Sequence, residues 1–142
     1  MTTPPYDSPE EAERAFYASF EARDIDAMMR VWADRDDVVC VHPMGDRLTG
    51  RRDIEMSWRQ IFGGDGELTF DIADPVYVTG TDISVHFVYE DIRFGPGPTD
   101  RSRVLATNTY VRGADGWRLL SHHGSPGVAV RRANPAPGTT VH

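Results

Sequence analysis

The spacing of apolar residues changes along this chain from a helical period to a period of two. In the first half, Ala12, Phe16 and Phe20 recur every four residues, which is typical of the buried face of an amphipathic helix. From Glu67 onward, apolar and polar residues alternate, as they do in strands that bury one face. Helices followed by antiparallel strands predict an α+β fold in which the helices cover one face of a single sheet.

Local signals divide the first half into three helices and one strand. Ser8 and Asp24 are candidate N-caps of the first two helices, and Gly63 is placed to end the third. Between the second and third helices, the β-branched run at residues 38–42 predicts a short strand that Pro43 stops. The order helix, helix, strand, helix therefore precedes the strands of the second half.

The second half contains four segments with strand-like alternation, residues 68–78, 83–89, 101–112 and 117–123. The GADG sequence between the last two is a hairpin signal. In the second segment the larger apolar side chains share one parity and are predicted to face the core; they are Ile83, Val85, Phe87 and Tyr89. His86 is then predicted to face outward.

The composition excludes several classes of function. The chain has 15 basic and 22 acidic residues, and the formal net charge of −7 argues against a nucleic-acid partner. Every basic residue is an arginine, so a Schiff-base lysine, a pyridoxal phosphate anchor and a phosphate-loop lysine are excluded. The lone Cys40 excludes an intrachain disulfide and is compatible with a reducing compartment.

The length of 142 residues is that of one domain with a single core, which we assign to residues 8–126. The ends, residues 1–7 and 127–142, are polar or rich in proline, glycine and arginine, and are predicted to be flexible tails. No apolar run is long enough to span a membrane, and the N-terminus lacks the basic and apolar regions of a signal peptide. We therefore expect a cytoplasmic protein with no membrane partner.

Three separated segments carry a family resemblance. They are the helix pair FYASFEARDIDAMMRVW, the strand, loop and helix start DDVVCVHPMGDRLTGRRDI, and the hairpin LATNTYVRGADGWRLLSHHGS. Over residues 8–126 the chain resembles the nuclear transport factor 2-like superfamily, in its SnoaL-like and calcium/calmodulin-kinase-association-like branch. The resemblance implies a cone-shaped α+β barrel, with three helices wrapped on a curved, mixed, mainly antiparallel sheet around an apolar pocket. It also implies homodimers formed through the outer face of the sheet.

The superfamily contains steroid isomerases, whose catalytic pattern maps by alignment onto Phe16, His42 and Thr107. The resemblance implies a tyrosine, a carboxylate base and a protonated carboxylic acid at these places, so all three residues differ. Phe16 donates no hydrogen bond and Thr107 is a poorer oxyanion partner, which argues against steroid isomerisation by that mechanism. His42 alone could move a proton near neutral pH, because an imidazole has a pKa of about 6.5.

Three polar residues are the candidates for catalysis, namely His42, His123 and Asn108. His42 ends the first strand, where the resembling fold opens into its pocket, and is the candidate general acid or base. The adjacent His122 and His123 must face opposite sides of a strand, and His123 shares the parity of Trp117, so we assign His123 to the inner face. Asn108 either orients a ligand carbonyl in the pocket or serves as a hydrogen-bonded structural amide.

The predicted pocket lining comes from the helices and from the inner strand faces. Its members are Tyr17, Trp32, Trp58, Cys40, Thr107 and Tyr89. Aromatic residues at helical spacing also serve as ordinary core, and a pocket walled by them favours a flat, apolar ligand over a nucleotide. The histidine spacing supports no metal site, and we expect no cofactor.

Two arginines after the Gly/Pro loop FGPGPTD leave their role open. Arg101 and Arg103 either pair with Glu90 or Asp91 across a hairpin or hold a carboxylate ligand, which the arginine fork suits well.

Two functions are expected for the chain as a whole. The first is an isomerase, cyclase or hydrolase that acts on a flat, apolar carbonyl compound with a histidine acid or base; the alternative is a non-catalytic homo-oligomeric assembly or ligand-binding module.

Overall fold

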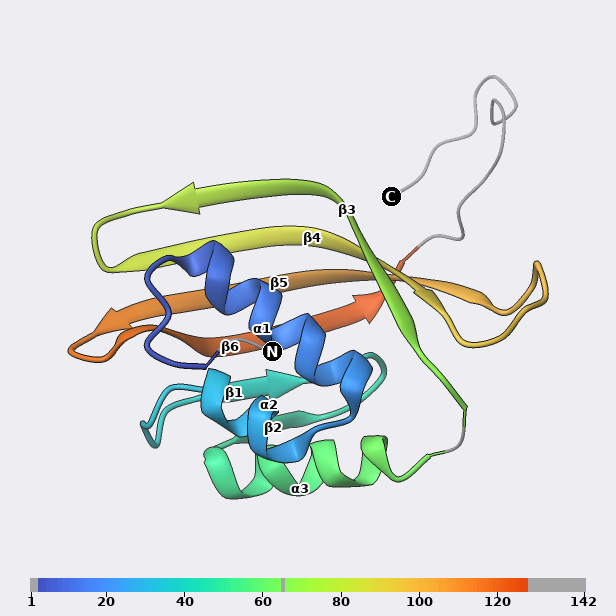
Figure 1. Ribbon diagram of the computed structural model, residues 1–142, viewed down its shortest axis with the longest axis horizontal. Helices are drawn as coiled ribbons and strands as arrows, with labels where there is room; N and C mark the ends of the chain where they lie inside the picture. Colours follow the sequence, from blue (N-terminus) through green and yellow to red (C-terminus); the bar gives the residue numbers. More distant parts are fainter. Residues whose placement is uncertain (1–2, 65, 128–142) are drawn as a thin grey trace.

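In the residues that it describes, 3–64 and 66–127, the computed structural model has three helices and six strands (Figure 1). The helices are α1 (Pro9–Ala22), α2 (Ile25–Val31) and α3 (Arg51–Phe62). The strands are β1 (Val39–Val41), β2 (Arg47–Thr49), β3 (Thr69–Thr79), β4 (Ile83–Arg93), β5 (Arg101–Gly113) and β6 (Gly116–Pro126). The predicted α+β order of elements is confirmed, and the short strand β2 is an addition to it.

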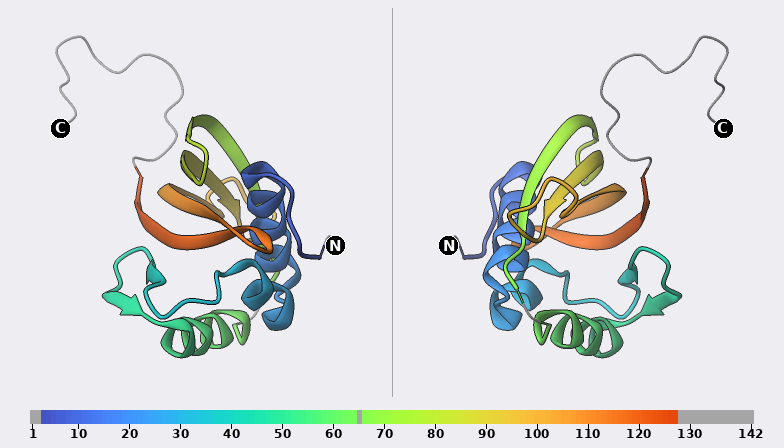
Figure 2. Two further views of the ribbon diagram at one scale, coloured as in Figure 1. Left: turned by 90° about the vertical axis from the view of Figure 1, so that its left-hand side faces the viewer. Right: turned by 90° about the vertical axis from the view of Figure 1, so that its right-hand side faces the viewer.

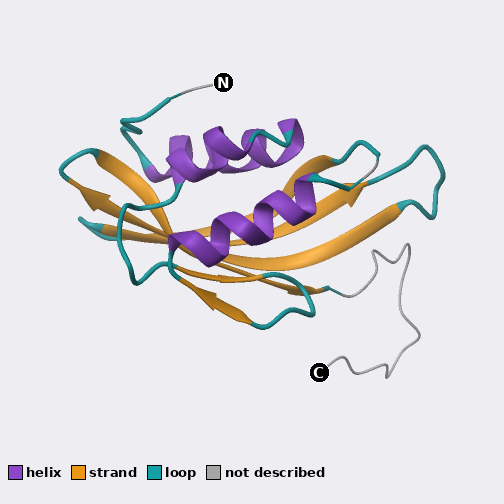
Figure 3. Cartoon of the chain, turned by 90° about the horizontal axis from the view of Figure 1, so that it is seen from below, coloured by secondary structure: helices purple, strands orange, loops and turns teal. Residues whose placement is uncertain are grey.

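The strands form one sheet in the order β2-β1-β6-β5-β4-β3. β1 runs parallel to β6, and the other neighbouring strands are antiparallel, so the sheet is mixed and mainly antiparallel as predicted. Figure 2 shows that the sheet curls strongly, with α1 against its inner side and α3 below β1. Seen from below, the helices lie together on one side of the sheet (Figure 3). The space between helices and sheet is the core, which confirms the predicted cone-shaped architecture.

The predicted N-caps are confirmed. Ser8 Oγ accepts a hydrogen bond from the N–H of Glu11 at 3.1 Å, and Asp24 Oδ1 accepts one from the N–H of Ala27 at 3.0 Å. Each bond satisfies a backbone donor that the first turn of a helix leaves without a partner. Between the two helices, Arg23 adopts the left-handed conformation with φ 53°, which ends α1 and allows the chain to reverse.

The edge of α1 that faces the sheet carries three polar side chains spaced by four residues, Glu13, Tyr17 and Glu21. Residues four apart lie on the same face of a helix. Glu13 Oε2 accepts a hydrogen bond from the hydroxyl of Tyr77 at 2.7 Å, and Glu21 Oε2 accepts one from the N–H of Phe70 at 3.2 Å. α1 is therefore tied to the edge strand β3 at both ends, with Tyr17 between the two ties.

The inner face of β4 is polar, and the sequence-based prediction for this strand is wrong. The buried side chains of the strand are Ser84, His86, Val88 and Glu90. Ile83 and Phe87, which were expected inside, are 48% and 43% exposed on the outer face. The polar parity faces inward because α1 supplies hydrogen-bond partners above it, and buried polar groups with partners are tolerated.

A β-bulge in β6 reverses the faces of the two adjacent histidines. The register between β5 and β6 shifts between Thr109 and Tyr110, which leaves Leu120 of β6 without a partner residue. An extra residue of this kind moves all later side chains to the opposite face. His122 is therefore buried and His123 is exposed, so the predicted inward orientation of His123 is wrong.

The N-terminal segment packs against β6. Tyr6 is only 2% exposed, forms a parallel bridge with Gly116, and accepts a hydrogen bond at its carbonyl from the N–H of Trp117 at 2.9 Å. Gly116 has φ +86°, and a Cβ there would lie 2.6 Å from the Tyr6 carbonyl oxygen, so only glycine fits. The prediction of a flexible tail over residues 1–7 therefore fails at Tyr6, and residues 128–142 of the other predicted tail lie outside the described residues.

Candidate functional site

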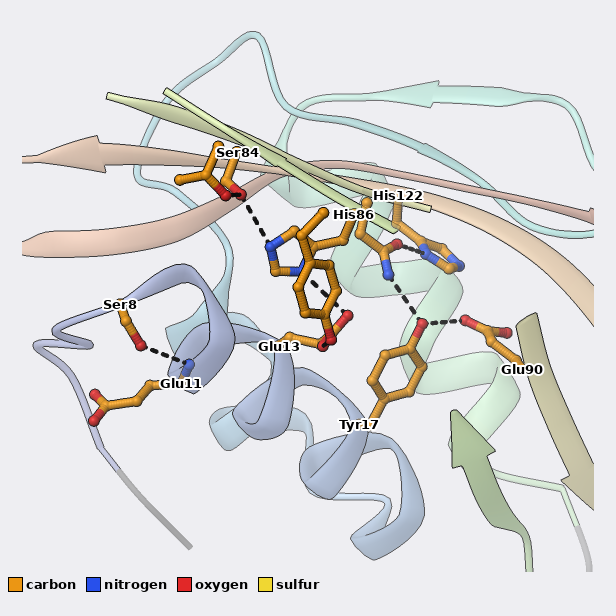
Figure 4. Close-up of polar contacts among 11 residues, drawn as sticks. Ser8, Glu11, Glu13, Tyr17, Ser84, His86, Glu90 and His122 are labelled. Atoms are coloured by element: carbon orange, nitrogen blue, oxygen red, sulfur yellow. Dashed lines mark hydrogen bonds and ion pairs between the residues drawn. The ribbon is translucent and has the colours of Figure 1, made fainter. Parts of the chain in front are cut away.

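Four polar side chains form a hydrogen-bonded chain across the core (Figure 4). His122 Nδ1 lies 2.6 Å from Asn108 Oδ1, and Asn108 Nδ2 donates to the Tyr17 hydroxyl at 2.9 Å. The Tyr17 hydroxyl donates to Glu90 Oε2 at 2.6 Å. All four side chains are buried, and α1, β4, β5 and β6 each contribute one of them. We call these four residues the interior chain.

Burial determines which end of the interior chain is charged. It raises the pKa of Glu90 from 4.5 to about 7, against the opposing effect of the hydrogen bond from Tyr17. Burial, followed by the neighbouring histidines, lowers the pKa of His122 from 6.5 to about 3, so this ring is neutral near pH 7. Burial and the nearby Glu90 raise the pKa of Tyr17 well above 10.0, which keeps its proton in place. Glu90 is therefore the member that titrates near neutral pH.

The directions of the hydrogen bonds follow from these charges. Because the carboxylate of Glu90 only accepts, the hydroxyl proton of Tyr17 points toward it and the phenol oxygen accepts from the Asn108 amide. The amide oxygen then faces the imidazole, so the neutral His122 carries its proton on Nδ1. Asn108 thus lies in the interior, as one of its two sequence interpretations required, and it fixes the position of the phenol.

His42 lies at the end of β1, half-buried, on the same side of the core as His122. Its Nε2 is 2.9 Å from the hydroxyl of Ser57, which itself donates to the carbonyl of Ile54 at 2.7 Å. A hydroxyl has one proton to donate, so the bond from His42 to Ser57 requires a proton on Nε2 and leaves a lone pair on Nδ1. Burial lowers the pKa of His42. Its ring packs edge-on against the ring of Trp58, with a distance of 4.7 Å between the ring centroids.

Cys40 lies two residues before His42 on β1 and points into the core. Its Sγ approaches His42 Nε2 to 3.6 Å, closer than the backbone spacing of the two residues suggests. Burial raises the pKa of the Cys40 thiol to about 12, so the sulfur remains a thiol near neutral pH. A thiol that keeps its proton is a poor nucleophile, and Cys40 serves as an apolar side chain of the core.

Aromatic rings pack around the interior chain. Their centroids lie 4.3 to 6.3 Å apart. The members of this aromatic wall are Phe16, Tyr17, Phe20, Trp58, Phe62 and Phe70. Trp32 is also fully buried but pairs with Leu119 beside the wall. The indole N–H groups of Trp32 and Trp58 have no hydrogen-bond partner among the described residues.

Three of the predicted site residues lie on the outer face of the sheet, namely His123, Thr107 and Tyr89. Thr107 is opposite His123 in the register of β5 and β6, and the guanidinium of Arg103 lies 4.6 Å above the ring of Tyr89. These predictions are wrong because the bulge in β6 and the reversed parity of β4 turn the side chains outward.

The alignment with steroid isomerases assigned their catalytic positions to Phe16, His42 and Thr107. In the structure, the polar residues that point into the interior at two of these positions are one residue further along the chain. Tyr17 rather than Phe16 supplies a hydroxyl from the first helix, and Asn108 rather than Thr107 faces the interior from β5. Sequence reasoning missed Glu90 and His122 as site residues. The signal that points to Glu90 is the four-residue spacing of polar side chains on α1, which brings Tyr17 over the sheet.

A second buried cluster surrounds Glu13, one turn before Tyr17 on α1. His86 Nδ1 is 3.2 Å from Glu13 Oε1, and its Nε2 is 3.0 Å from Ser84 Oγ (Figure 4). The His86 ring lies between the rings of Tyr77 and Tyr110, at centroid distances of 4.0 and 4.8 Å. This cluster attaches α1 to β3 and β4 and so holds the interior chain in register.

In the described part of the chain, two of the surface clefts have volumes of about 660 and 370 Å³. The larger one lies at the β4–β5 hairpin, the smaller one beside Tyr6, and neither includes a residue of the interior chain. Within residues 3–64 and 66–127, no three His, Cys, Asp or Glu side chains converge as ligands for a metal ion. No helix in the described part of the chain has the length and apolar character to cross a membrane.

The fold and the residues of the core agree with one protein family. The family model of the SnoaL-like domain matches residues 10–129 of this chain. The chain belongs to the SnoaL-like family. Its three-helix cone and mixed sheet are the architecture that the resemblance implied, so both the family and the fold are now established for this SnoaL-like domain.

Two similar structures cover most of this SnoaL-like domain. A candidate calcium/calmodulin-dependent protein kinase type II association domain from Thiobacillus denitrificans is 40% identical over 90% of this chain and 100% of its own, with a TM-score of 0.82. A candidate dehydratase of the NTF2-like family from Streptomyces avermitilis is 33% identical over 83% of this chain and 92% of its own, with a TM-score of 0.75.

A plant protein shares the same region. The F-box protein SKIP8 of Arabidopsis thaliana is 24% identical over 110 residues, which are 78% of this chain. The chain spans 46% of the length of that protein, less than half of it.

Proposed function

We propose that this SnoaL-like domain is a proton-transfer enzyme of the isomerase, cyclase or hydrolase type that acts on a small, flat, apolar carbonyl compound. The observation that carries the proposal is the hydrogen bond of 2.6 Å between Tyr17 and Glu90, whose pKa of about 7 is suited to acid and base roles near neutral pH. Structural ion pairs are usually placed at the surface, whereas this carboxyl group is 2% exposed without a cationic partner among the described residues.

The proposed step begins at a C–H bond next to the substrate carbonyl. That bond breaks, its proton passes to the ionised carboxylate of Glu90, and its electron pair enters the enolate. Protonated Glu90 no longer needs the hydrogen bond from Tyr17, so the hydroxyl turns to the enolate oxygen while Asn108 holds the phenol. Return of the proton from Glu90 to a different carbon completes an isomerisation. If the substrate carries a β-hydroxyl group, its C–O bond breaks as the enolate collapses, the proton held by Glu90 passes to the departing oxygen, and water leaves.

His42 is proposed as the second acid or base, at the half-buried end of β1. Its Nδ1 lone pair and its lowered pKa fit a group that is neutral near pH 7 and takes up a proton from the substrate side. The aromatic wall gives the substrate class, since rings favour flat and apolar ligands. Phe70 of the edge strand packs against Tyr17 at a centroid distance of 5.8 Å, and Phe20 of α1 packs against Phe70 at 4.3 Å. The proposal therefore requires that these two rings move to admit a substrate.

The test is hydrogen exchange on carbonyl compounds. We expect the protein in deuterated buffer near neutral pH to exchange the α-protons of at least one flat ketone, such as 2-tetralone or 1-indanone, as measured by mass spectrometry. Glu90→Gln is expected to lower the exchange rate by about 10²- to 10⁴-fold, the usual contribution of a general base, and Tyr17→Phe by a smaller factor. Glu67→Gln, an exposed change of the same kind, is the control. Exchange that survives Glu90→Gln, or no exchange above buffer, contradicts the proposal.

A second candidate function, homodimeric assembly, is favoured by the outer face of the sheet. Five apolar side chains are exposed there, and we call them the outer patch: Val76, Val78, Ile83, Phe87 and Leu105. Phe87 lies opposite Val76 in the register of β3 and β4, so the patch is continuous across strands. A second copy of this chain is the proposed occupant, because a two-fold axis lets the same apolar patch cover itself.

Phe87→Arg is expected to convert the dimer to a monomer, because it places a charge at the centre of the outer patch. Light scattering coupled to size-exclusion chromatography measures the mass. Met56→Arg is the matched control, since Met56 is 60% exposed on α3, away from the patch. A wild-type protein that is monomeric, or a Phe87→Arg variant that remains dimeric, would rule out this interface.

A further inference from the structure

We propose that the cleft at the β4–β5 hairpin binds the carboxylate group of a small organic acid, at a site separate from the interior chain. The cleft has a volume of about 660 Å³, within the range of about 300–1,000 Å³ that is usual for small-molecule sites. Arg93 and Arg101 line it, together with Thr99, Ser102 and the acidic residues Asp71 and Asp91. The hairpin lies at the right-hand end of the sheet in Figure 1 and extends past the end of β6.

Arg93 and Arg101 are directly opposite each other in the register of β4 and β5. Like charges at such positions repel, because the Cβ atoms of a cross-strand pair are only about 5 Å apart. Arg93 NH2 lies 3.0 Å from Asp71 Oδ2, and this exposed ion pair contributes little stability. The guanidinium of Arg101 has no hydrogen bond or ion pair among the described residues. The second guanidinium is therefore left to bind an anion.

The carboxylates nearest to Arg101 in sequence and register are already engaged. Asp91 forms two hydrogen bonds with Arg103, of 2.7 and 2.9 Å. The side chain of Asp100 accepts the N–H of Gly97 at 3.0 Å, within the hairpin loop itself. The structure thus decides between the two roles that the sequence left open, since Arg103 forms a cross-strand pair and Arg101 does not.

The loop that walls the cleft is shaped in advance by Asp100. Besides its side-chain bond to Gly97, Asp100 accepts the N–H of Phe94 at its carbonyl, at 3.1 Å. A Cβ at Gly97 would lie 2.9 Å from Asp100 Oδ2, so a side chain at this place would displace the carboxylate of Asp100. On the other side of the cleft, the N–H of Gly127 donates to the carbonyl of Arg103 at 2.8 Å. Walls held in this way lose little conformational entropy when a ligand binds.

The lining also indicates what kind of acid fits. A guanidinium fork matches the two oxygens of a carboxylate. Ile92, Pro98 and Pro126 add apolar surface to the lining, which favours an acid with an apolar body over a bare inorganic ion.

The experiment is an NMR titration of the isotopically labelled full chain with benzoate, and separately with inorganic phosphate. We expect saturable shifts of amide signals confined to the cleft, at Thr99, Ser102 and Gly127, with benzoate binding more tightly than phosphate. Arg101→Gln is expected to weaken benzoate binding about tenfold or more, the usual effect of losing a hydrogen bond to a charged group. Arg93→Gln is expected to weaken it too, while Arg47→Gln, an exposed change on β2, leaves it unchanged.

Three results would overturn the proposal. One is the absence of saturable shifts with benzoate, and another is unchanged affinity in Arg101→Gln. The third is phosphate binding as tight as that of benzoate, which removes the role of the apolar lining. Because the interior chain takes no part in this site, a negative result in the exchange experiment does not affect this titration.

Discussion

Glu90→Gln is expected to stabilise the folded protein above pH 7. The folded state raises the pKa of this carboxyl group from 4.5 to about 7, so at higher pH it contains a buried negative charge that the unfolded chain exposes to water. The stability that the protonated group contributes is complete below 4.5 and is lost as pH rises through about 7. At about 1.4 kcal/mol per pH unit, the loss is roughly 3 kcal/mol.

Urea unfolding at about pH 8 and about pH 4 measures the effect. Glutamine keeps the size of the side chain and an oxygen that accepts from Tyr17, so the variant is expected to gain stability at the higher pH only. Glu67→Gln, on the surface, tests for a general effect of removing a negative charge. If Glu90→Gln lowers stability at about pH 8, the buried carboxylate is instead held by favourable contacts, and the raised pKa is wrong.

Acid is expected to destabilise the protein through His122, with the opposite sign. Its pKa falls from 6.5 in the unfolded chain to about 3 in the core. Between these two pH values, the unfolded chain binds a proton at His122 and the folded protein does not. The stabilising contribution of the neutral ring is complete above 6.5 and is lost as pH falls through about 3. The largest loss is about 5 kcal/mol.

His122→Gln is expected to remove most of this acid sensitivity, because glutamine can still donate to Asn108 Oδ1 and does not titrate. The free energy of unfolding at about pH 7 and about pH 4 is again the measurement. His123→Gln is the matched control, since the next residue is exposed and faces the other side. A His123→Gln variant that loses the acid sensitivity, or a His122→Gln variant that keeps it, would show that the faces of the two histidines are assigned incorrectly.

The two groups oppose each other between about pH 4.5 and 6.5. In this window, rising pH weakens the protein through Glu90 and strengthens it through His122, so the wild-type profile is flatter than either effect alone. Each single variant exposes the slope of the remaining group. The double variant is expected to show neither slope.

Local features of the sequence were sufficient for the three helices and for the strands other than β2. Ser8 and Asp24 cap helices because a short polar side chain reaches the free N–H groups of the first turn whatever the rest of the protein does. The turn between β5 and β6 formed at GADG for a similarly local reason. The short edge strand β2 was missed, because three residues carry too little alternation to be seen.

The candidate site depended on contacts between distant parts of the chain. By the rule of alternation, the more apolar side chains of a strand are expected to be buried. In β4 these side chains lie on the outer face instead. The polar side chains can be buried because α1 places the hydroxyl of Tyr17 where it donates a hydrogen bond to Glu90. In β6, the sequence gives no sign that Leu120 has no partner residue in β5, because a bulge depends on how two strands pair. One such residue exchanged His123 for His122 in the core.

The sequence by itself thus determined the three helices, the strands other than β2, the order of these elements, the family resemblance and the exclusion of lysine chemistry. These depend on the spacing of residue types along one chain, and spacing is local. Only the tertiary structure decided which side chains meet, because packing α1 on the sheet and skipping one residue in β6 join residues 17, 90, 108 and 122 in one chain of hydrogen bonds. Packing also left the side chain of Arg101 without a partner among residues 3–64 and 66–127, since Asp91 and Asp100 are bound elsewhere.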